Sequence, residues 1–390
     1  MRFIHTADWH LGRLFHNVHM TDDQAHVLEQ LVDIVADTRP DAVIVAGDIY
    51  DRAVPPPEAV DLLDHVLSRM VVDLKVPVIL IAGNHDSPGR LNFGSRLLAG
   101  RRLYVTGNLP RICEPIILHD GDGPVHFYAL PFAEPSMVRA CLECEEAVDH
   151  DTAMHALLNR IRSSHLTGER RVLIGHAFVA GGDGCESERP LSVGGAGTVN
   201  AGRFHGFHYV ALGHLHRPQS LACGEGEPPI HYSGSILKYS FDEAAQPKHV
   251  YLVEMDGAGR CVKQAIPLTP RRDVRRLSGL MADLLRGPTD RSRCEDYLEV
   301  LIEDEGPVMD AMARLREVYP NVLHLRPRES ASRATGDRPN IRITSDVDLF
   351  KSFFQHVTGE PLTSEHEAAF VATIDAMHSG QREAQAGEQA

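Results

Sequence analysis

Five apolar, strand-like runs in the first 216 residues end in Asp, His or Asn, and this recurrence constrains the fold more than any other feature. The five endings are Asp8-Trp9-His10, Gly47-Asp48, Gly83-Asn84-His85-Asp86, Gly175-His176 and Gly213-His214-Leu215-His216. Because buried strands deliver their last residues to a common edge of the sheet, we expect these endings to converge although they are far apart in sequence. Such a convergence predicts a metal site.

The first 255 residues alternate short β runs with amphipathic helical stretches, which predicts a layered α/β domain. We expect helices at 22–37, after Pro55-Pro56-Pro57, and at 152–165. The spacing changes from about Val105, and a second sheet is expected to contain residues 115–118, 125–130, 230–233 and 249–255.

The composition shifts after Pro267 and predicts further units. A strand at 297–302, a helix at 308–318 and a strand at 322–325 indicate a small α+β module, and a helix pair is expected on either side of Gly359-Glu360-Pro361. The predicted divisions are a main domain at 1–268, the α+β module at 269–326, a linker at 327–345, a helical segment at 346–378 and a disordered tail at 379–390.

Charge and cysteine content exclude several classes of protein. A net charge of −15 argues against binding nucleic acid through a basic field over the whole protein, so any such contact is local. Seven scattered cysteines argue against a disulfide framework, and Cys141 and Cys144 have zinc-knuckle spacing without a second pair, which favours ordinary reduced cysteines. The chain starts in strand-like sequence and has no apolar run of about 18 residues, so we expect a cytoplasmic protein without membrane contact.

The strand endings supply carboxylate, imidazole and amide ligands without thiolate, a mixture suited to manganese, iron, zinc or magnesium. The candidate ligands are Asp8, His10, Asp48, Asn84, His176, His214 and His216. Seven ligands are too many for one tetrahedral site and suit two metals, with Asp48 as the bridging carboxylate. Two metals roughly 3.5 to 4 Å apart can drive in-line displacement at phosphorus, which predicts phosphoester hydrolysis.

His85 is not needed to complete the metal ligands, so it is a candidate to contact a phosphate oxygen or to protonate the leaving group. Asp51 and Asp86 are candidates to orient His85 or another histidine through their carboxylates. The glycine-rich segment Gly181–Arg203 lies between two candidate ligands and is either a substrate-contacting lid or a flexible connection. A non-enzymatic scaffold that kept the fold but lost catalytic activity is a further alternative. Degenerate sites usually lose metal ligands, however, and all seven candidate ligands are present.

These motifs resemble the calcineurin-like metallophosphoesterases, whose pattern is Asp-x-His, Gly-Asp, Gly-Asn-His-Asp/Glu, Gly-His and Gly-His-x-His. The resemblance narrows to the SbcD family, the nuclease subunits of bacterial SbcCD complexes. The residues that carry it are 5–12, 47–52, 232–235 and 240–243. It implies a four-layer sandwich of two mixed β-sheets flanked by helices, followed by a small capping domain and C-terminal helices.

The resemblance also implies roles for the candidate residues. The first metal would be held by Asp8, His10, Asp48 and His216, and the second by Asp48, Asn84, His176 and His214. Two Mn²⁺ ions are implied, with Mg²⁺, Fe²⁺ or Zn²⁺ as substitutes, and His85 would assist catalysis. Archaeal and eukaryotic relatives commonly have His at the position of Asp51, so a second catalytic histidine does not carry over, although Asp51 stays a candidate catalytic residue.

The implied function is a Mn-dependent DNA nuclease, a double-strand exonuclease and single-strand or hairpin endonuclease in double-strand-break repair and recombination. ATP would enter only through an SbcC-type coiled-coil ATPase, in a heterotetramer that contains a homodimer of this chain at the nucleoid. Phe350, Phe353 and Phe354 are candidates to bind that partner, or to pack on this chain's own core. Arg271, Arg272, Arg275 and Arg276 are candidates to contact DNA, or form a solvated hinge. A stand-alone phosphomonoesterase or cyclic-nucleotide phosphodiesterase is the alternative.

Overall fold

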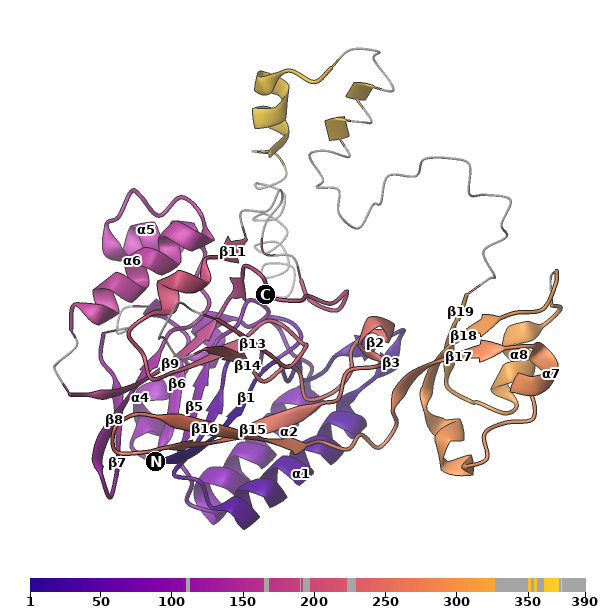
Figure 1. Cartoon of the computed structure of the whole chain (residues 1–390), viewed down its shortest axis with the longest axis horizontal. Helices are drawn as coiled ribbons and strands as arrows, with labels where there is room; N and C mark the ends of the chain where they lie inside the picture. The colour runs from indigo at the N-terminus through magenta and orange to yellow at the C-terminus, as the bar shows by residue number, and fades with distance from the viewer. Residues whose placement is uncertain are drawn as a thin grey trace.

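The computed structural model describes residues 1–109, 113–164, 168–189, 191, 197–222, 229–306, 308–326, 350–351, 354–355, 361–371 and 373. Two six-stranded sheets lie together between helical layers (Figure 1). The predicted layered α/β architecture, with two mixed sheets flanked by helices, is therefore confirmed. Within the described ranges, no helix is long and apolar enough to cross a membrane.

The first sheet combines strands from both ends of the main domain. In spatial order it contains β16 (Cys261–Pro267), β15 (His249–Met255), β1 (Arg2–Thr6), β4 (Ala42–Val45), β5 (Val78–Ile81) and β6 (Leu103–Thr106). The four strands β1, β4, β5 and β6 run parallel to one another, whereas β15 and β16 are antiparallel to their neighbours. β4 and β5 are buried along their whole length, which explains their unbroken apolar sequence.

The second sheet is built from the middle of the chain. In spatial order it contains β13 (Gln219–Leu221), β14 (Ile230–Tyr232), β12 (Tyr209–Gly213), β9 (Arg170–His176), β8 (Gly123–Ala129) and β7 (Ile116–Asp120). Three of the four runs expected in this sheet are β7, β8 and β14. The expectation for residues 249–255 was wrong, because β15 pairs with β1 and so extends the first sheet. The five endings come from both sheets, since β1, β4 and β5 belong to the first and β9 and β12 to the second.

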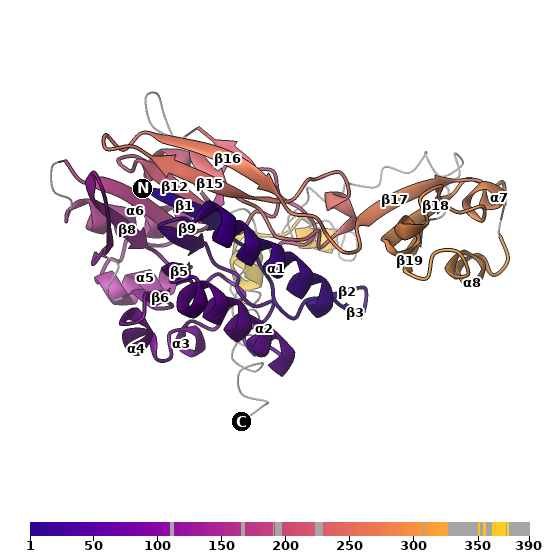
Figure 2. The same cartoon turned by 90° about the horizontal axis from the view of Figure 1, so that it is seen from below.

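Helices cover the outer faces of the two sheets. Figure 2 shows α1 and α2 packed along the first sheet. α5 and α6 pack on the second sheet through a shared apolar core. The bounds are α1 (Thr21–Thr38), α2 (Pro57–Ser68) with a π-helical turn η1 (Arg69–Asp73), α3 (Pro88–Leu91), α4 (Ser95–Ala99), α5 (Pro135–Leu142) and α6 (His150–Arg162). α2 begins at a proline, as predicted, and α6 begins at a capping box formed by Asp149 and Thr152.

The hydrophobic core has three layers, one between the sheets and one beneath each helical layer. The inner layer joins side chains such as Phe3 and Ile44 of the first sheet to Phe127 and Tyr209 of the second. Short elements connect the layers, and they are β2 (Leu14–Phe15), β3 (Val18–His19), β10 (Phe178–Val179), β11 (Thr198–Val199), η4 (Ala201–Phe204) and η5 (Phe241–Glu243). This packing fixes the two sheets against each other and therefore fixes the strand ends that carry the candidate ligands.

A small α+β module follows the main domain and lies to its side in both views (Figures 1 and 2). Its elements are β17 (Val274–Gly279), α7 (Met281–Leu284), η6 (Arg291–Glu295), β18 (Tyr297–Ile302), α8 (Ala311–Arg316) and β19 (Val322–Arg326). The three strands form one parallel sheet with its own apolar core. β18 matches the predicted strand, whereas α8 is shorter than the helix predicted at 308–318.

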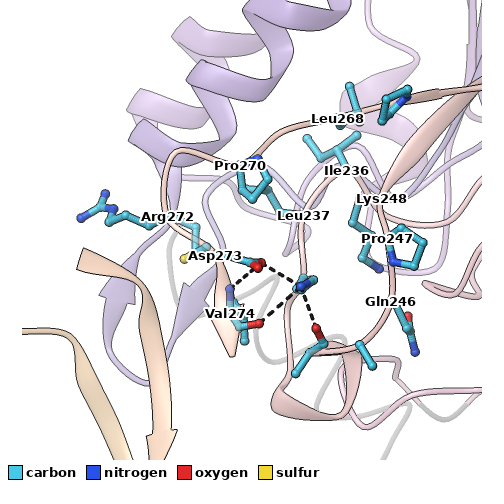
Figure 3. A pocket seen from close by; sticks show the side chains of 15 residues that line it. Ile236, Leu237, Gln246, Pro247, Lys248, Leu268, Pro270, Arg272, Asp273 and Val274 are labelled. Carbon is cyan, nitrogen blue, oxygen red and sulfur yellow. Dashed lines mark hydrogen bonds and ion pairs between the residues drawn. The ribbon is translucent and has the colours of Figure 1, made fainter. Parts of the chain in front are cut away.

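The junction between the main domain and the module is polar. The buried carboxylate of Asp23 accepts hydrogen bonds from Arg272 Nη2 at 2.6 Å and from the Tyr297 hydroxyl at 2.8 Å. A pocket of about 290 Å³ lies at this junction and is lined largely by proline and aliphatic residues (Figure 3). At its edge Lys238 donates to Asp273 Oδ1 and to the Ala244 carbonyl, both at 2.8 Å. None of the candidate metal ligands lines this pocket.

The tail is described only in part. Residues 350–351, 354–355 and 364–371 are helical, and the Phe350 ring stacks on Phe370 with centroids 3.9 Å apart. Phe354 contacts Phe350 and His366. The Phe350 and Phe354 rings thus pack against other residues of the tail. Phe353, the predicted linker 327–345 and the predicted disordered tail 379–390 lie outside the described residues.

Candidate metal centre

The candidate ligands meet where strands of both sheets end. Asp8 and His10 follow β1, Asp48 follows β4, Asn84 follows β5, His176 ends β9, and His214 and His216 follow β12. The parallel register of the strands brings these ends to the same side of the sandwich. Backbone hydrogen bonds then join the turns, from Asp8 N to the Gly47 carbonyl at 3.1 Å and from His10 N to the Asp48 carbonyl at 3.0 Å.

Glycines before the candidate ligands allow the turns to approach closely. A Cβ atom on Gly83 would lie 2.1 Å from Asp48 Oδ1, and one on Gly213 would lie 2.1 Å from the Ala46 carbonyl oxygen. Both distances are far below van der Waals contact, so any side chain at either position would push the strand ends apart. The Gly-Asn-His and Gly-His pairs seen in the sequence therefore have a steric cause.

Four candidate ligands have left-handed backbone conformations. The φ angles are 52° at Asp8, 47° at His10, 48° at Asp48 and 100° at His214. Such conformations cost non-glycine residues about 1–3 kcal/mol each and persist only where the surrounding structure imposes them. Here they turn side chains inward directly after a strand, where extended backbone would continue past the site.

The candidate ligands form two groups, and Asp48, a member of the second, also lies close to the first. A third set of possible metal donors, His10, Asp51 and His85, adjoins the first group. Ligand atoms of Asp8, His10 and His216 lie within 4.8 Å of one another, as do those of Asp48, His176 and His214. Asp48 Oδ2 lies 3.6 Å from His10 Nε2 in the first group and 3.4 Å from His176 Nε2 in the second. Asp48 thus has the position that a bridging carboxylate needs.

Asn84 belongs with the second group. Its Oδ1 lies 2.9 Å from His176 Nε2 and 3.1 Å from His214 Nδ1. His176 Nδ1 donates to the Ala46 carbonyl at 2.9 Å, which turns Nε2 toward Asn84 and Asp48. The amide oxygen and two imidazoles therefore face a common point.

The buried electrostatics of the centre fit a cation. Asp8 Oδ2 is buried without a hydrogen-bond partner in the described part of the chain. Burial raises the pKa of Asp8 well above its usual value and lowers the pKa of His10 and His214 well below theirs. His176 differs, because burial, which lowers its pKa, is outweighed by Asp48, Asp8 and the Ala46 carbonyl together, and its pKa is raised to about 9. Buried oxygen and nitrogen donors of this kind suit divalent metal ions.

His85 is held beside the centre by the main chain of Asp51. His85 Nδ1 donates to the Asp51 carbonyl at 2.7 Å, and its backbone N–H donates to Asp48 Oδ1 at 2.9 Å. Its Nε2 is left 3.9 Å from Asp48 Oδ2. The Asp51 carboxylate instead accepts from Arg13 at 2.9 Å and lies 3.7 Å from His10 Nδ1. Asp51 therefore orients His85 through its carbonyl, and the prediction that its carboxylate orients a histidine remains for His10 alone.

The expectation that Asp86 orients a histidine through its carboxylate was wrong. Its Oδ2 accepts from the backbone N–H groups of Gly83 and Ile49, at 2.8 and 3.1 Å, and Oδ1 accepts from that of Tyr50 at 2.9 Å. Burial raises the pKa of Asp86 to about 7. Asp86 thus ties the turn after β5 to the turn after β4.

The segment Gly181–Arg203 contributes side chains that the sequence interpretation did not single out. Ser187 and Glu188 both form hydrogen bonds to His216, and Glu243 and Lys248 lie behind them. Glu243 lies in the stretch 240–243 that carries part of the resemblance, which was the one available signal. At these residues the segment is packed against the centre, so they are not part of a flexible connection.

Three of the four candidate DNA-contacting arginines are neutralised within the chain. Arg272 pairs with Asp23, and Arg275 pairs with Asp296, each at 2.6 Å. Arg276 pairs with both Glu299 and Asp242, at 2.7 and 2.8 Å. Arg271 is exposed. The pairing favours a structural role for Arg272, Arg275 and Arg276 at the junction, and DNA contact by the cluster stays a prediction.

Comparison with known proteins places these features in context. Residues 1–218 match the family described as calcineurin-like phosphoesterase, and residues 270–358 match the family described as type 5 capsule protein repressor C-terminal domain. Relatives from Staphylococcus saprophyticus and Staphylococcus epidermidis, both named as the SbcD subunit of the nuclease SbcCD, are each 32% identical over 93% of this chain and 95% of their own. A solved dimetal phosphatase from Danio rerio aligns over 69% of this chain and 99% of its own at 13% identity, with a TM-score of 0.42, too weak to carry an argument.

Proposed function

Since the chain belongs to the calcineurin-like phosphoesterase family, and within it to the SbcD nuclease subunits, we propose that it hydrolyses phosphodiester bonds of DNA. The observation that carries the proposal is the position of Asp48 between two groups of buried metal donors, with His85 alongside. The site suits an anionic phosphate once two divalent cations are bound, because their four positive charges exceed the two carboxylate charges of Asp8 and Asp48.

Asp8, His10, Asp48 and His216 would hold one ion, and Asp48, Asn84, His176 and His214 the other. When bound, the two ions would activate the attacking water and stabilise the charge that develops on phosphate. We propose Mn²⁺ as the preferred ion, since the mixed carboxylate, amide and imidazole donor set accepts it, with Mg²⁺, Fe²⁺ or Zn²⁺ as substitutes.

His85 is proposed to protonate the leaving oxygen. The hydrogen bond from Nδ1 to the Asp51 carbonyl fixes the ring so that Nε2 faces the centre, where it can carry a proton. Asp51 is proposed to position His85 through its main chain, while its carboxylate holds Arg13. His85 would therefore act on the chemical step and not on metal affinity.

The substrate is tested by comparing two phosphoesters. With Mn²⁺ and its ATPase partner, the purified chain is expected to degrade linear duplex DNA and to open hairpins, at rates far above its hydrolysis of a chromogenic phosphomonoester. Reactions without metal and without ATP are the controls. Turnover of the small ester alone would refute the nuclease proposal and favour a stand-alone phosphomonoesterase or cyclic-nucleotide phosphodiesterase.

We propose an SbcC-type coiled-coil ATPase as the partner, with ATP entering only through it and with the complex acting at the nucleoid. The proposal rests on the names of the relatives and on the helical segment that the sequence predicts at 346–378. In the described part of this segment, Phe350 stacks on Phe370 and Phe354 lies against Phe350, so these rings would present a preassembled apolar surface. Co-purification with the ATPase tests this assignment.

We also propose that two copies of this chain form a homodimer within the complex. Phe93, between α3 and α4, and Leu97, in α4, are 87% and 82% exposed, and they are among the most exposed large apolar side chains in the described ranges. Burying a Phe or Leu side chain contributes about 1.5–3 kcal/mol, and a two-fold interface would bury each residue twice. The double substitution Phe93→Asp and Leu97→Asp is therefore expected to weaken dimerisation at least about 100-fold in sedimentation equilibrium.

The matched control for the dimer is Val262→Asp, because Val262 is also 71% exposed but lies on β16 of the first sheet. It should leave the dissociation constant unchanged. A Phe93→Asp and Leu97→Asp variant that dimerises as tightly as the unmodified chain would contradict this location of the interface.

A further inference from the structure

The Ser187 hydroxyl lies between a buried carboxylate and a candidate metal ligand. Ser187 Oγ is 2.6 Å from Glu243 Oε1 and 2.6 Å from His216 Nδ1. Glu243 and His216 are fully buried, and Ser187 is almost so. The three side chains come from separate parts of the sequence, and the segment Gly181–Arg203 brings the serine to the other two.

The direction of the hydrogen bonds follows from the charge of Glu243. Lys248 Nζ lies 2.6 Å from Glu243 Oε2, so the carboxylate is ionised and can only accept hydrogen bonds. The single Ser187 hydroxyl proton is therefore donated to Glu243 Oε1. The Ser187 oxygen must then accept the proton of His216 Nδ1, which leaves His216 Nε2 without a proton.

The unprotonated Nε2 of His216 is the ring nitrogen that faces the centre. His216 Nε2 points into the centre and lies 2.9 Å from His10 Nε2. A nitrogen that carries no proton can donate its lone pair to a metal ion, whereas a protonated one cannot. A relay from Glu243 through Ser187 thus selects the tautomer that a metal ligand needs.

Two further contacts hold Ser187 in place. Glu188 Oε1 accepts the backbone N–H of His216 at 2.7 Å, which fixes the segment to the turn after β12. Arg13 donates to the Ser187 carbonyl at 2.9 Å and, with its other terminal nitrogen, to Asp51 Oδ1 at 2.9 Å. The relay is therefore built into the site and does not depend on a mobile side chain.

We propose that Ser187 is a positioning residue that couples Glu243 to His216 and sets the metal-binding tautomer of His216. The proposal rests on the proposed function, because it assumes that His216 binds a metal ion. Without the hydroxyl, Glu243 Oε1 is 3.7 Å from His216 Nδ1, too far for a direct hydrogen bond. The proton of His216 is then free to move to Nε2, where it competes with the metal.

The test measures Mn²⁺ binding directly, by calorimetry on the full chain with Mn²⁺ as the only ligand. Ser187→Ala is expected to weaken the affinity for one of the two Mn²⁺ ions by about 10- to 100-fold. Such a loss is typical when a residue that is hydrogen-bonded to a metal ligand is removed. Ser187→Thr keeps the hydroxyl and should restore the affinity. Ser220→Ala is the matched control, since Ser220 forms an equivalent 2.9 Å hydrogen bond to His231 Nδ1 away from the centre and should leave Mn²⁺ affinity unchanged.

The tautomer is read in the metal-free protein by nitrogen-15 NMR of the histidine rings. His216 is expected to carry its proton on Nδ1 in the unmodified chain and to lose this preference in Ser187→Ala. A proton on Nε2 in the unmodified chain, or equal Mn²⁺ affinity in Ser187→Ala, would overturn the relay. An unmodified chain that binds no Mn²⁺ would overturn the proposed function as well, so the two failures are distinguishable.

Discussion

The His85→Ala variant is expected to lose about 100- to 10,000-fold in the rate of DNA cleavage while binding two Mn²⁺ ions as tightly as the unmodified chain. The reason is geometric. His85 belongs to neither of the two groups of candidate ligands, although it lies with His10 and Asp51 in a third set of possible donors, and its Nδ1 is already bonded to the Asp51 carbonyl. Removing it takes away the proposed proton donor and leaves all seven candidate ligands in place. Single-turnover kinetics and Mn²⁺ calorimetry measure the two effects separately.

His205→Ala is the matched control for this loss. His205 also donates through Nδ1 to a backbone carbonyl, that of Gly202 at 3.0 Å, but it is exposed and remote from the centre. Its replacement should leave cleavage unaffected. Cleavage at the unmodified rate by His85→Ala would refute the catalytic assignment, and loss of metal binding in that variant would make His85 a ligand instead.

The Asp48→Asn variant should also lose most of its activity, because the substitution removes the negative charge that both proposed ions share. Each metal ion supplies several kcal/mol of transition-state stabilisation, and every 1.36 kcal/mol is a factor of ten in rate, so we expect a loss of roughly 1000-fold or more. Asparagine keeps the shape of the side chain and an oxygen that can accept the His85 backbone N–H. We expect the Mn²⁺ content, measured by calorimetry and elemental analysis, to fall from two ions to at most one.

The matched control is Asp37→Asn on the exposed face of α1, which removes one carboxylate charge far from the centre. It should change neither the rate of DNA cleavage nor the Mn²⁺ content. Two tightly bound ions in Asp48→Asn would show that Asp48 is not shared. Comparing Asp48→Asn with His85→Ala also separates the roles of Asp48 and His85, since only Asp48→Asn is expected to reduce the Mn²⁺ content.

The candidate ligands could be predicted because each one follows an apolar run that is local in sequence. Asp8, Asp48 and His176 need only the rule that buried strands end at a common edge. The place of residues 249–255 in the first sheet could not be predicted, because it depends on the pairing of β15 with β1 across most of the domain. Local periodicity assigns a strand to residues 249–255 but contains nothing about its neighbour.

The surroundings of the ligands were harder to predict than the ligands themselves. The Asp86 carboxylate is next to His85 in sequence, yet it accepts hydrogen bonds from three backbone N–H groups in two turns and from no histidine among the described residues. The arginines after residue 270 form a basic run in sequence, but Asp23 and Asp296 neutralise two of them in space. Partners of this kind are set by rotamers and long-range packing, which leave no pattern in the sequence.

The central position of β1 in the first sheet has a consequence for how the chain is made. β1 and β4 are synthesised long before β15, so β4 can pair with one edge of β1 early. The other edge of β1 stays unpaired until β15 has been synthesised. In the folded domain the amino group of Met1 donates a hydrogen bond to the Met255 carbonyl at 2.9 Å, at the end of β15. An unpaired edge of an apolar strand invites association with other chains. During most of its synthesis the nascent domain is therefore an open sheet that needs shielding, and residues 249–255 are the segment that closes it.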